Sequence, residues 1–420
     1  MRFDMEDRKY IETICSEAKA ASRVIANYDT VKRNNILLNM ASSLKERCDY
    51  ILDENRRDLA AADREGMGPA MKDRLMLDRN RVIAMALSIE EIAALPDPVG
   101  RIEKMTVRPS GIRVGQMRVP IGVIGVIYEA RPNVTTDIAA LCIKSGNAAI
   151  LRGGKEAIHS NRALHAVVRE ALTASGCPAA AVSFIGRTER ELVPILLKMD
   201  TYIDIVIPRG GESLIRAVVS ESTIPVIRHD KGVCHIFIDE SAEEDMANRI
   251  AVNAKCQRPS VCNAMETLLI HSGYPHKKSL LNALMNHGVE VRGCRRTVAI
   301  DPERIKPASE QDFGREFLDL ILAVKIVNSL DEAMEHIAAY GSNHSEAIVT
   351  SNYLNAERFL REVDSSAVFV NASTRFHDGG EFGLGAEVGI STQKLHARGT
   401  MGVEGLTTLK YVVYGRGEVR

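Results

Sequence analysis

The first part of the chain carries its hydrophobic residues at the spacing of amphipathic helices. Apolar positions recur every three or four residues through 11–25, 31–44 and 82–95, which predicts three helices that each bury one face. A highly charged stretch over 45–64 separates the second from the third. The sequence LPDPVG at 95–100 then predicts the end of the helical region, because proline and glycine interrupt helices.

From about residue 119 onward, short apolar runs alternate with helical patterns, and this alternation is interrupted once, around 229–232. The predicted strands lie over 119–128, 148–152, 182–185, 203–207, 233–238, 267–271, 289–292, 318–326, 346–350 and 367–371. Strands that alternate with helices predict mostly parallel sheets covered by helices on both faces. The fold class is therefore α/β, with two successive α/β domains.

Two other segments predict an exposed β-flap. Residues 106–116 have the pattern of a hairpin with the turn Pro109-Ser-Gly111, and 406–414 near the end is a further strand. A two-stranded ribbon alone is marginal in water and leaves its edges unpaired. We therefore expect the flap to dock on another copy, which makes the protein at least a dimer.

Composition excludes several classes of protein. The 54 Lys and Arg residues balance 55 Asp and Glu residues, so no overall charge attracts nucleic acid or an anionic membrane. The run at 119–128 is shorter than the ~20 residues that span a bilayer, and the charged start of the chain has no apolar signal core. We expect a soluble, cytoplasmic protein whose eight cysteines are reduced.

Glycine-rich turns are the first candidate for chemistry. GxGxxG and GxxxxGK[ST] are absent, but RGGK at 152–155 and PRGG at 208–211 each follow a predicted strand and open a helix. Amides at a helix start bind phosphate, and a basic neighbour helps. Either turn alone is more typical of ordinary chain reversal than of phosphate binding. Together, with Gly210 and Gly211 in the second, they favour a dinucleotide at the carboxyl edge of the sheet.

Cys262 is the candidate nucleophile. It ends the polar, basic stretch NAKCQRPSVC at 253–262, and a thiolate forms more readily beside basic groups. The alternative is a small buried residue, as most free cysteines are. Cys256 fits that alternative better, because it ends an apparent helix.

Other chemistries have weaker support. The eleven His residues are dispersed with no HExxH and no zinc-finger spacing, so we expect no metal. No GxSxG marks a serine hydrolase. The segment FVNASTRFHDGGE at 369–381 combines amide, hydroxyl, guanidinium and carboxylate groups. That set suits a zwitterionic ligand, although an ordinary polar loop has the same composition.

Five longer stretches are more specific than any single motif. They are VPIGVIGVIYEARPNVTTDIAALCIKSGN from 119, LRGGKEA from 151, KCQRPSVCNA from 255, VNASTRF from 370 and GLGAEVGISTQKLHARG from 383. With them, nearly the whole chain resembles the γ-glutamyl phosphate reductase family, also called glutamate-5-semialdehyde dehydrogenases, within the aldehyde dehydrogenase superfamily. That family uses NADPH to reduce L-glutamyl 5-phosphate to L-glutamate 5-semialdehyde in proline biosynthesis.

The resemblance implies roles for individual residues. Cys262 is the nucleophile and Asn133 the oxyanion-stabilising amide. The cofactor residues it implies are Arg152 and Lys155 at the adenosine ribose and Glu316 at the nicotinamide ribose. The residues expected to bind the substrate are Arg131, Arg258, Asn371, Ser373 and Arg375. Arg258 and Lys255 are candidates to neutralise the departing phosphate.

The resemblance also implies a domain plan. A Rossmann-type dinucleotide-binding domain covers 1–105 and 119–230, a catalytic domain covers 231–385, and an oligomerisation β-flap is made of 106–118 and 400–420. The expected partners are the small-molecule substrate and other copies of the chain, with no nucleic acid and no membrane. Contact with glutamate 5-kinase, which precedes this family in the pathway, is left open.

Two departures from ordinary aldehyde dehydrogenases favour reduction with NADPH. They carry an acid where this chain has Lys155, and a lysine suits a 2′-phosphate. They also carry a general-base Glu where this chain reads RHDKG at 228–232. A hydrolytic base is not needed when hydride discharges the acyl-enzyme, and water attack would be a side reaction.

Three other functions stay open on the sequence alone. An aldehyde oxidiser of the same fold requires a glutamate that faces Cys262. A non-catalytic dinucleotide-binding scaffold requires a buried, unreactive Cys262. A metal-dependent alcohol dehydrogenase requires a metal site.

Overall fold

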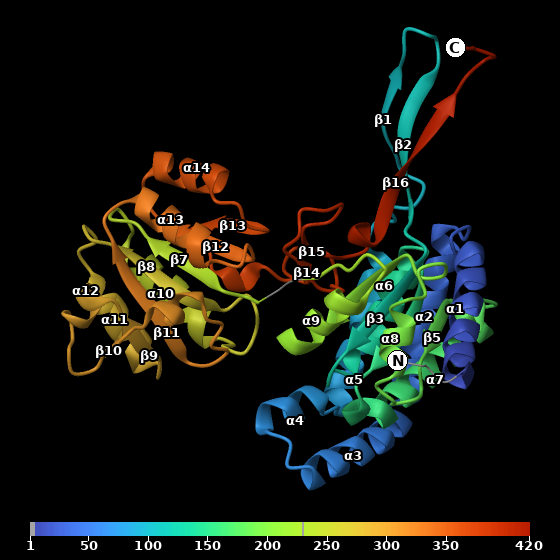
Figure 1. The fold of residues 1–420 in the computed structure, drawn as a ribbon, viewed down its shortest axis with the longest axis horizontal. Coiled ribbons are helices and arrows are strands. Elements are labelled where there is room, and N and C mark those ends of the chain that lie inside the picture. Colours follow the sequence, from blue (N-terminus) through green and yellow to red (C-terminus); the bar gives the residue numbers. More distant parts are fainter. Residues whose placement is uncertain (1–4, 229–230) are drawn as a thin grey trace. The chain divides into compact units, whose positions relative to one another are not determined.

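The computed structural model describes residues 5–228 and 231–420. The chain divides into two compact units. The first unit comprises Met1–Arg228, Gly383–Gly389 and Thr400–Arg420, and the second comprises His229–Phe382 and Ile390–Gly399. Each unit contains its own parallel sheet (Figure 1).

The N-terminal helices of the first unit confirm the three helices predicted from the periodicity and add two more, α3 and α4. They are α1 (Met5–Ile25), α2 (Thr30–Glu46), α3 (Cys48–Arg64), α4 (Pro69–Leu75) and α5 (Arg79–Ala94). The charged stretch 45–64 is mostly α3, whose inward face includes polar residues. Asp58 is buried there and accepts the N–H groups of His159 and Ser160. A polar side chain on the buried face hides the helical period from a hydrophobicity pattern.

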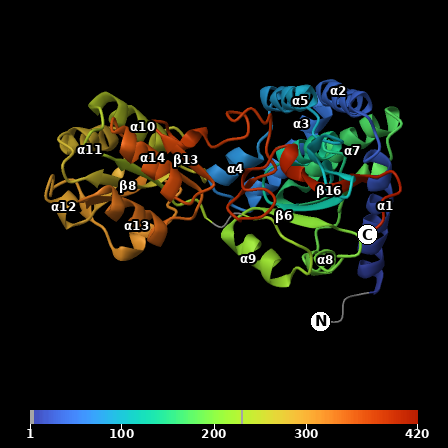
Figure 2. The ribbon, with the colours of Figure 1, turned by 90° about the horizontal axis from the view of Figure 1, so that it is seen from above.

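The sheet of the first unit has the strand order β5-β4-β3-β6, and all its strands are parallel. Its strands are β3 (Val123–Tyr128), β4 (Ala148–Gly153), β5 (Val182–Phe184) and β6 (Ile205–Arg209). Its helices are α6 (Asn133–Lys144), α7 (Ile158–Ala174), α8 (Leu192–Leu196) and α9 (Glu212–Glu221). Figure 2 shows α8 and α9 on one side of β6, with α2, α5 and α7 on the other. Helices therefore cover both faces, as predicted.

The apolar run predicted as one strand over 119–128 is wrong in one respect, because it contains a strand end and a strand start. The chain leaves β2 at Pro120 and enters β3 at Val123. Gly122 between them has φ +134°, and a Cβ there would lie 2.2 Å from Asp204 Oδ2. The break is thus set by backbone conformation and a close contact, neither of which changes the hydrophobic pattern.

The two glycine turns flank β3. They follow β4 and β6, which pair with opposite edges of β3. All three strands end at one edge of the sheet because they are parallel. The turn after β3, over 129–133, therefore lies between the two glycine turns.

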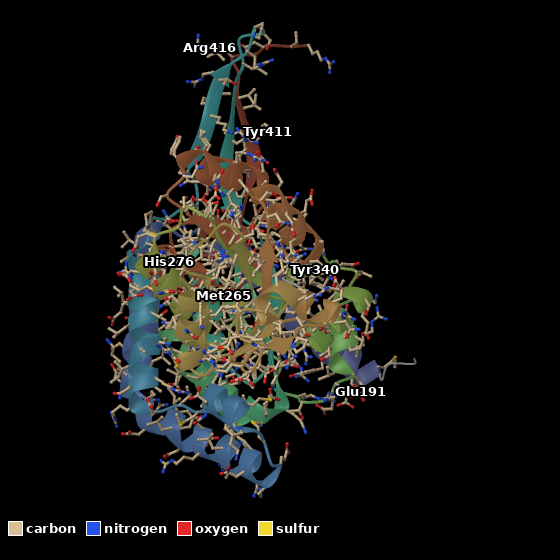
Figure 3. The ribbon with its side chains drawn as sticks, turned by 90° about the vertical axis from the view of Figure 1, so that its left-hand side faces the viewer. Glu191, Met265, His276, Tyr340, Tyr411 and Arg416 are labelled. Atoms are coloured by element: carbon tan, nitrogen blue, oxygen red, sulfur yellow. The ribbon has the colours of Figure 1, made fainter. Side chains whose placement is uncertain are left out.

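The flap is a three-stranded antiparallel ribbon. It consists of β1 (Ile102–Val107), β2 (Arg113–Pro120) and β16 (Thr407–Tyr414), with β2 in the centre. Its outer strands expose large apolar side chains, including Val107 at 70% and Tyr411 at 71%. Figure 3 labels Tyr411 on the ribbon and Arg416 near its tip. Both outer edges of the ribbon can accept another strand.

The second unit is built on a seven-stranded parallel sheet with the order β10-β9-β11-β8-β7-β12-β13. Its strands are β7 (Cys234–Ile238), β8 (Met265–His271), β9 (Glu290–Gly293), β10 (Lys306–Pro307), β11 (Ile321–Val327), β12 (Ser345–Val349) and β13 (Ala367–Val370). Its helices are α10 (Glu244–Cys256), α11 (Lys277–Asn286), α12 (Arg295–Val298), α13 (Leu330–Tyr340) and α14 (Tyr353–Glu362). The short strands β14 (Ile390–Ser391) and β15 (Gly399–Thr400) pair with each other.

Two apolar clusters hold that sheet between helices. One includes Ala251 and Leu281 from α10 and α11 against Leu268. The other includes Ala333 and Phe359 from α13 and α14, packed with residues of β7, β8, β11 and β12. The sheet is therefore rigid on both faces, and its loops can carry chemistry. In the part of the chain that the structure describes, no helix is both long and apolar enough to cross a bilayer.

Candidate active site

Cys262 lies in the loop between α10 and β8, and its side chain is half-buried. The backbone of Gly232 packs directly against it. A Cβ at Gly232 would lie 2.0 Å from the Cys262 carbonyl oxygen and 2.7 Å from its Cα. The Gly232 N–H donates to Glu316 Oε1 at 3.0 Å. Only a glycine permits this approach, so Gly232 sets the position of the Cys262 backbone.

A second thiol, that of Cys234, also contacts this loop. Cys234 is fully buried at the start of β7, and its Sγ donates to the Cys262 carbonyl oxygen at 3.2 Å. Burial raises the pKa of the Cys234 thiol well above its usual value, so it stays protonated. Cys234 is therefore a hydrogen-bond donor in this site and not a second nucleophile.

The segment predicted to bind a zwitterion contacts the Cys262 loop. The Arg375 guanidinium donates to Asn263 Oδ1, and its Nε donates to Gln257 Oε1 at 2.7 Å. Thr374 Oγ1 donates to the Asn263 carbonyl oxygen at 2.7 Å. These bonds hold the Cys262 loop and the polar segment as one body.

Positive charge gathers near the thiol. Burial lowers the pKa of the half-buried Arg375, and Arg258 lowers it further, while Asp378 and Cys262 oppose both effects. Arg258 is exposed. A thiolate at Cys262 would relieve the cost of burying the Arg375 charge, so the two groups favour each other's ionised forms.

Two of the other predicted substrate residues bond to the backbone. Asn371 has φ +54°, accepts the Thr350 N–H and donates to the Thr350 carbonyl, both at 2.9 Å. Ser373 is buried, and its Oγ accepts the Arg375 N–H at 3.3 Å. These contacts shape the loop that carries Arg375.

Lys255 does not lie where a departing phosphate could use it, so that expectation is wrong. Its ammonium is fully buried and donates to Glu266 Oε2 at 2.6 Å. A lysine in an apolar interior needs a counter-charge, and this one has it in place. Cys256 ends α10, as its sequence position predicts.

In the first unit, the turn after β3 places Asn133 at the start of α6. Ala130 in this turn has φ +34°, and its N–H donates to Glu156 Oε1 at 2.6 Å. Asn133 is exposed, and its Nδ2 donates to Asp137 Oδ2 at 2.9 Å. Burial raises the pKa of Asp137 to about 6, while the hydrogen bond from the Asn133 amide and the charge of Arg209 act to lower it. Asp137 thus fixes the orientation of the Asn133 amide. Arg131, in the same turn, is half-buried.

The turn after β4 separates two basic residues with different surroundings. Arg152 is buried and donates to the carbonyl oxygens of Gly153 and Thr188, at 2.7 and 3.1 Å. The side chain of Lys155 is 64% exposed and lies 3.9 Å from Glu65. Arg152 therefore organises the turn, and Lys155 is the cation that a ligand can reach.

The carboxylate of Glu129 already binds the backbone in the turn after β6. Glu129 Oε2 accepts the Gly211 N–H at 2.8 Å, and a Cβ at Gly210 would lie 2.4 Å from the same oxygen. A phosphate at this amide would have to replace Glu129. Nothing in the sequence marks Glu129 except its position directly after an apolar strand.

The stretch 228–232 lies only partly within the structure. His229 and Asp230 are outside the described residues, and Lys231 Nζ donates to the Gly314 carbonyl oxygen at 2.6 Å. Within residues 5–228 and 231–420, no three His, Cys, Asp or Glu side chains gather in a group that could hold a metal ion.

Comparison with known proteins gives consistent matches. Residues 1–290 match the model of the aldehyde dehydrogenase family. The γ-glutamyl phosphate reductase of Caldanaerobacter subterraneus is 54% identical over 412 residues, which cover 98% of this chain and 99% of the relative. That of Geobacter metallireducens is 54% identical over 414 residues, which cover 98% of each chain.

Solved structures agree with these matches. The crystal structure of γ-glutamyl phosphate reductase from Thermotoga maritima has a TM-score of 0.94 at 45% identity, covering 98% of this chain and 99% of that chain. An acetylating aldehyde dehydrogenase from Geobacillus thermoglucosidasius, at 18% identity with a TM-score of 0.72 over the full length of both chains, shares the fold. The predicted aldehyde-dehydrogenase-like α/β fold is confirmed.

The contact between Gly232 and Cys262 gives a first prediction. Gly232→Ala should reduce turnover by about 100-fold or more, because a shift of about 1 Å in the nucleophile costs that much. Gly68→Ala is the matched control, since a Cβ at Gly68 meets nothing within 4 Å. Steady-state rates of both purified variants, with circular dichroism to check folding, test this. Wild-type turnover in Gly232→Ala would contradict the assigned role.

Proposed function

Since the chain belongs to the aldehyde dehydrogenase family and groups within it with the γ-glutamyl phosphate reductases, we propose that it reduces L-glutamyl 5-phosphate to L-glutamate 5-semialdehyde and phosphate. This reaction is the second step of proline biosynthesis from glutamate. The observation that carries the proposal is the half-buried Cys262 thiol, braced by Gly232 and electrostatically coupled to Arg375.

The first step forms a thioester. The Cys262 thiolate attacks the γ-carbonyl carbon, and the C–O π electrons move onto the oxygen. The Asn133 amide and the Cys262 backbone N–H stabilise this oxyanion, and one such donor is typically worth about 3–4 kcal/mol. Asp137 holds one N–H of the Asn133 amide and leaves the other for the substrate, because an amide nitrogen has two donors.

The oxyanion then collapses and expels phosphate. Phosphate is already a good leaving group, so the step needs no strong general acid. Arg258, which is exposed, offsets the charge of the phosphate. Arg131 and Arg375 bind the α-carboxylate, and Asn371 and Ser373 keep Arg375 in place.

The residues of the first unit fit a phosphorylated dinucleotide. Lys155 offers a reachable cation for a 2′-phosphate, and Arg152 holds the turn that presents it. Gly210 and Gly211 lie where the cofactor is expected, but Glu129 already accepts the Gly211 N–H, so a cofactor phosphate at this amide would have to displace that carboxylate. Glu316 in the second unit would hold the nicotinamide ribose. NADPH, when bound, would supply the hydride to the thioester carbon, and cleavage of the C–S bond would then release the aldehyde and return the Cys262 thiolate.

The nucleophile is tested by Cys262→Ala. Loss of the thiol removes the thioester route, so NADP⁺ reduction that depends on both phosphate and glutamate semialdehyde should fall at least about 1000-fold. Cofactor binding, measured by fluorescence of NADPH, should stay at the wild-type level. Cys256→Ala is the control and should keep wild-type rates. Substantial turnover in Cys262→Ala would refute the covalent route.

Cofactor choice is tested at Lys155. Lys155→Glu should raise KM for NADPH by about 10- to 100-fold, the worth of a charge-assisted bond, and leave KM for NADH nearly unchanged. Lys155→Met, which only removes the charge, should fall between the wild type and Lys155→Glu. Equal losses with both cofactors would show that Lys155 does not contact the 2′-phosphate.

The ribbon of β1, β2 and β16 is proposed to pair with another copy of the chain, because it exposes apolar side chains and unpaired edges. Tyr411→Asp/Val413→Asp should shift the sedimentation coefficient to that of a smaller species. Tyr353→Asp, at an equally exposed residue of α14, should not. A wild-type chain that sediments as a monomer would contradict the pairing. Contact with glutamate 5-kinase remains a prediction from the resemblance alone.

A further inference from the structure

A fully buried ion pair joins the two ends of the loop that carries Cys262. Lys255 lies in the last turn of α10, just before the loop, and Glu266 is the second residue of β8, just after it. Their side chains are 0% exposed, and Lys255 Nζ lies 2.6 Å from Glu266 Oε2. Figure 3 labels the neighbouring Met265, the first residue of β8. The ion pair therefore joins the two ends of the loop formed by residues 257–264.

The second oxygen of Glu266 reaches a different segment. Glu266 Oε1 accepts the Leu318 N–H at 3.1 Å. Leu318 has φ +56°, a left-handed conformation that a bulky residue adopts only when its surroundings impose it. It lies two residues after Glu316. Glu266 therefore fixes the backbone of the segment that presents Glu316.

These contacts form a closed circuit around Cys262. From Lys255 the connection runs through Glu266 and Leu318 to Glu316, and Glu316 accepts the Gly232 N–H. The backbone of Gly232 packs against Cys262. This series of contacts thus ends at the loop that follows Lys255 in the chain. A displacement at any member must move the Cys262 backbone or break a contact.

Stability alone does not account for the pair. Burial raises the pKa of Glu266 to about 7 and lowers that of Lys255. Their mutual attraction is the largest effect that opposes both shifts, and the Leu318 N–H also lowers the pKa of Glu266. Well-packed apolar residues would fill the same space without the cost of removing two charges from water. What apolar residues could not do is fix a donor and an acceptor at a single separation.

We propose that Lys255 and Glu266 are positioning residues, whose ion pair holds the Cys262 loop and the Glu316 segment in a fixed relation. The roles of Cys262 and Glu316 in this statement rest on the proposed function. Neither Lys255 nor Glu266 touches the reacting atoms. Their effect on the reaction is transmitted through the backbone of the loop.

The test is the double variant Lys255→Met/Glu266→Gln. It removes both charges together, so neither is left buried alone, and the glutamine keeps an acceptor for the Leu318 N–H. We expect the double variant to fold, whereas Glu266→Gln alone leaves a buried ammonium and is more strongly destabilised. Alkylation of Cys262 by iodoacetamide, located by peptide mass spectrometry, should slow about tenfold, because the thiol is no longer held beside Arg375.

Turnover gives a second readout. With the loop released, kcat should fall about 100-fold, and KM for NADPH should rise because Glu316 is no longer fixed. The control is Arg33→Met/Asp97→Asn, which removes another buried pair, with side chains 4% and 8% exposed and 3.1 Å apart. The control should leave the Cys262 alkylation rate within twofold of the wild type.

Two results would overturn the inference. One is a folded Lys255→Met/Glu266→Gln variant that alkylates Cys262 at the wild-type rate. The other is an Arg33→Met/Asp97→Asn control that slows alkylation equally, since the effect would then be general loss of stability. Alkylation needs neither substrate nor cofactor. It therefore decides the inference even if the wild-type chain does not reduce acyl phosphates, a result that would refute only the proposed function.

Discussion

The contact of the Gly232 backbone with the Cys262 carbonyl is the constraint on which the rest of the site depends. Cys262 lies in a loop without regular secondary structure, so its position must be fixed by tertiary contacts. Gly232 supplies a rigid surface on one side, and the Cys234 thiol donates to the Cys262 carbonyl. Arg375 and Thr374 hold the neighbouring Asn263. Each of these hydrogen bonds is worth only about 1 kcal/mol net, and their combined effect is a single loop conformation.

Carboxylates perform the corresponding task in the first unit. Glu156 accepts the Ala130 N–H, and Glu129 accepts the Gly211 N–H, so two backbone donors at the sheet edge are already satisfied. Helix and turn amides usually attract phosphate. Here the negative charge of Glu129 opposes a phosphate at the same amide. Cation side chains such as Lys155 must then supply more of the attraction for an anionic cofactor than backbone amides do.

The sequence predicted the fold well where hydrophobic period alone decides the element. It failed at α3, because Asp58 faces inward to cap α7, and at 119–128, because the strand break depends on the left-handed φ of Gly122 beside Asp204. The family resemblance assigns proposed roles to Cys262 and Asn133. The residues that hold these two side chains in position are Gly232, Asp137 and Glu266. Gly232 and Glu266 act through contacts between segments far apart in the chain, which no local pattern encodes. Asp137 lies one helical turn after Asn133, so that contact is local.

Arg375 and Arg258 illustrate why two guanidinium groups near one thiol are not redundant. Arg375 is half-buried and already donates through Nε to Gln257 and through Nη1 to Asn263, so two of its five donors are committed. A group held in this way stabilises a charge at a fixed place, as the Cys262 thiolate would be in the proposed reaction. Arg258 is exposed, so its side chain can move with a negative charge that changes position. In the proposed reaction the negative charge starts on sulfur and leaves with phosphate, so a fixed cation serves the first state and a mobile cation serves the second.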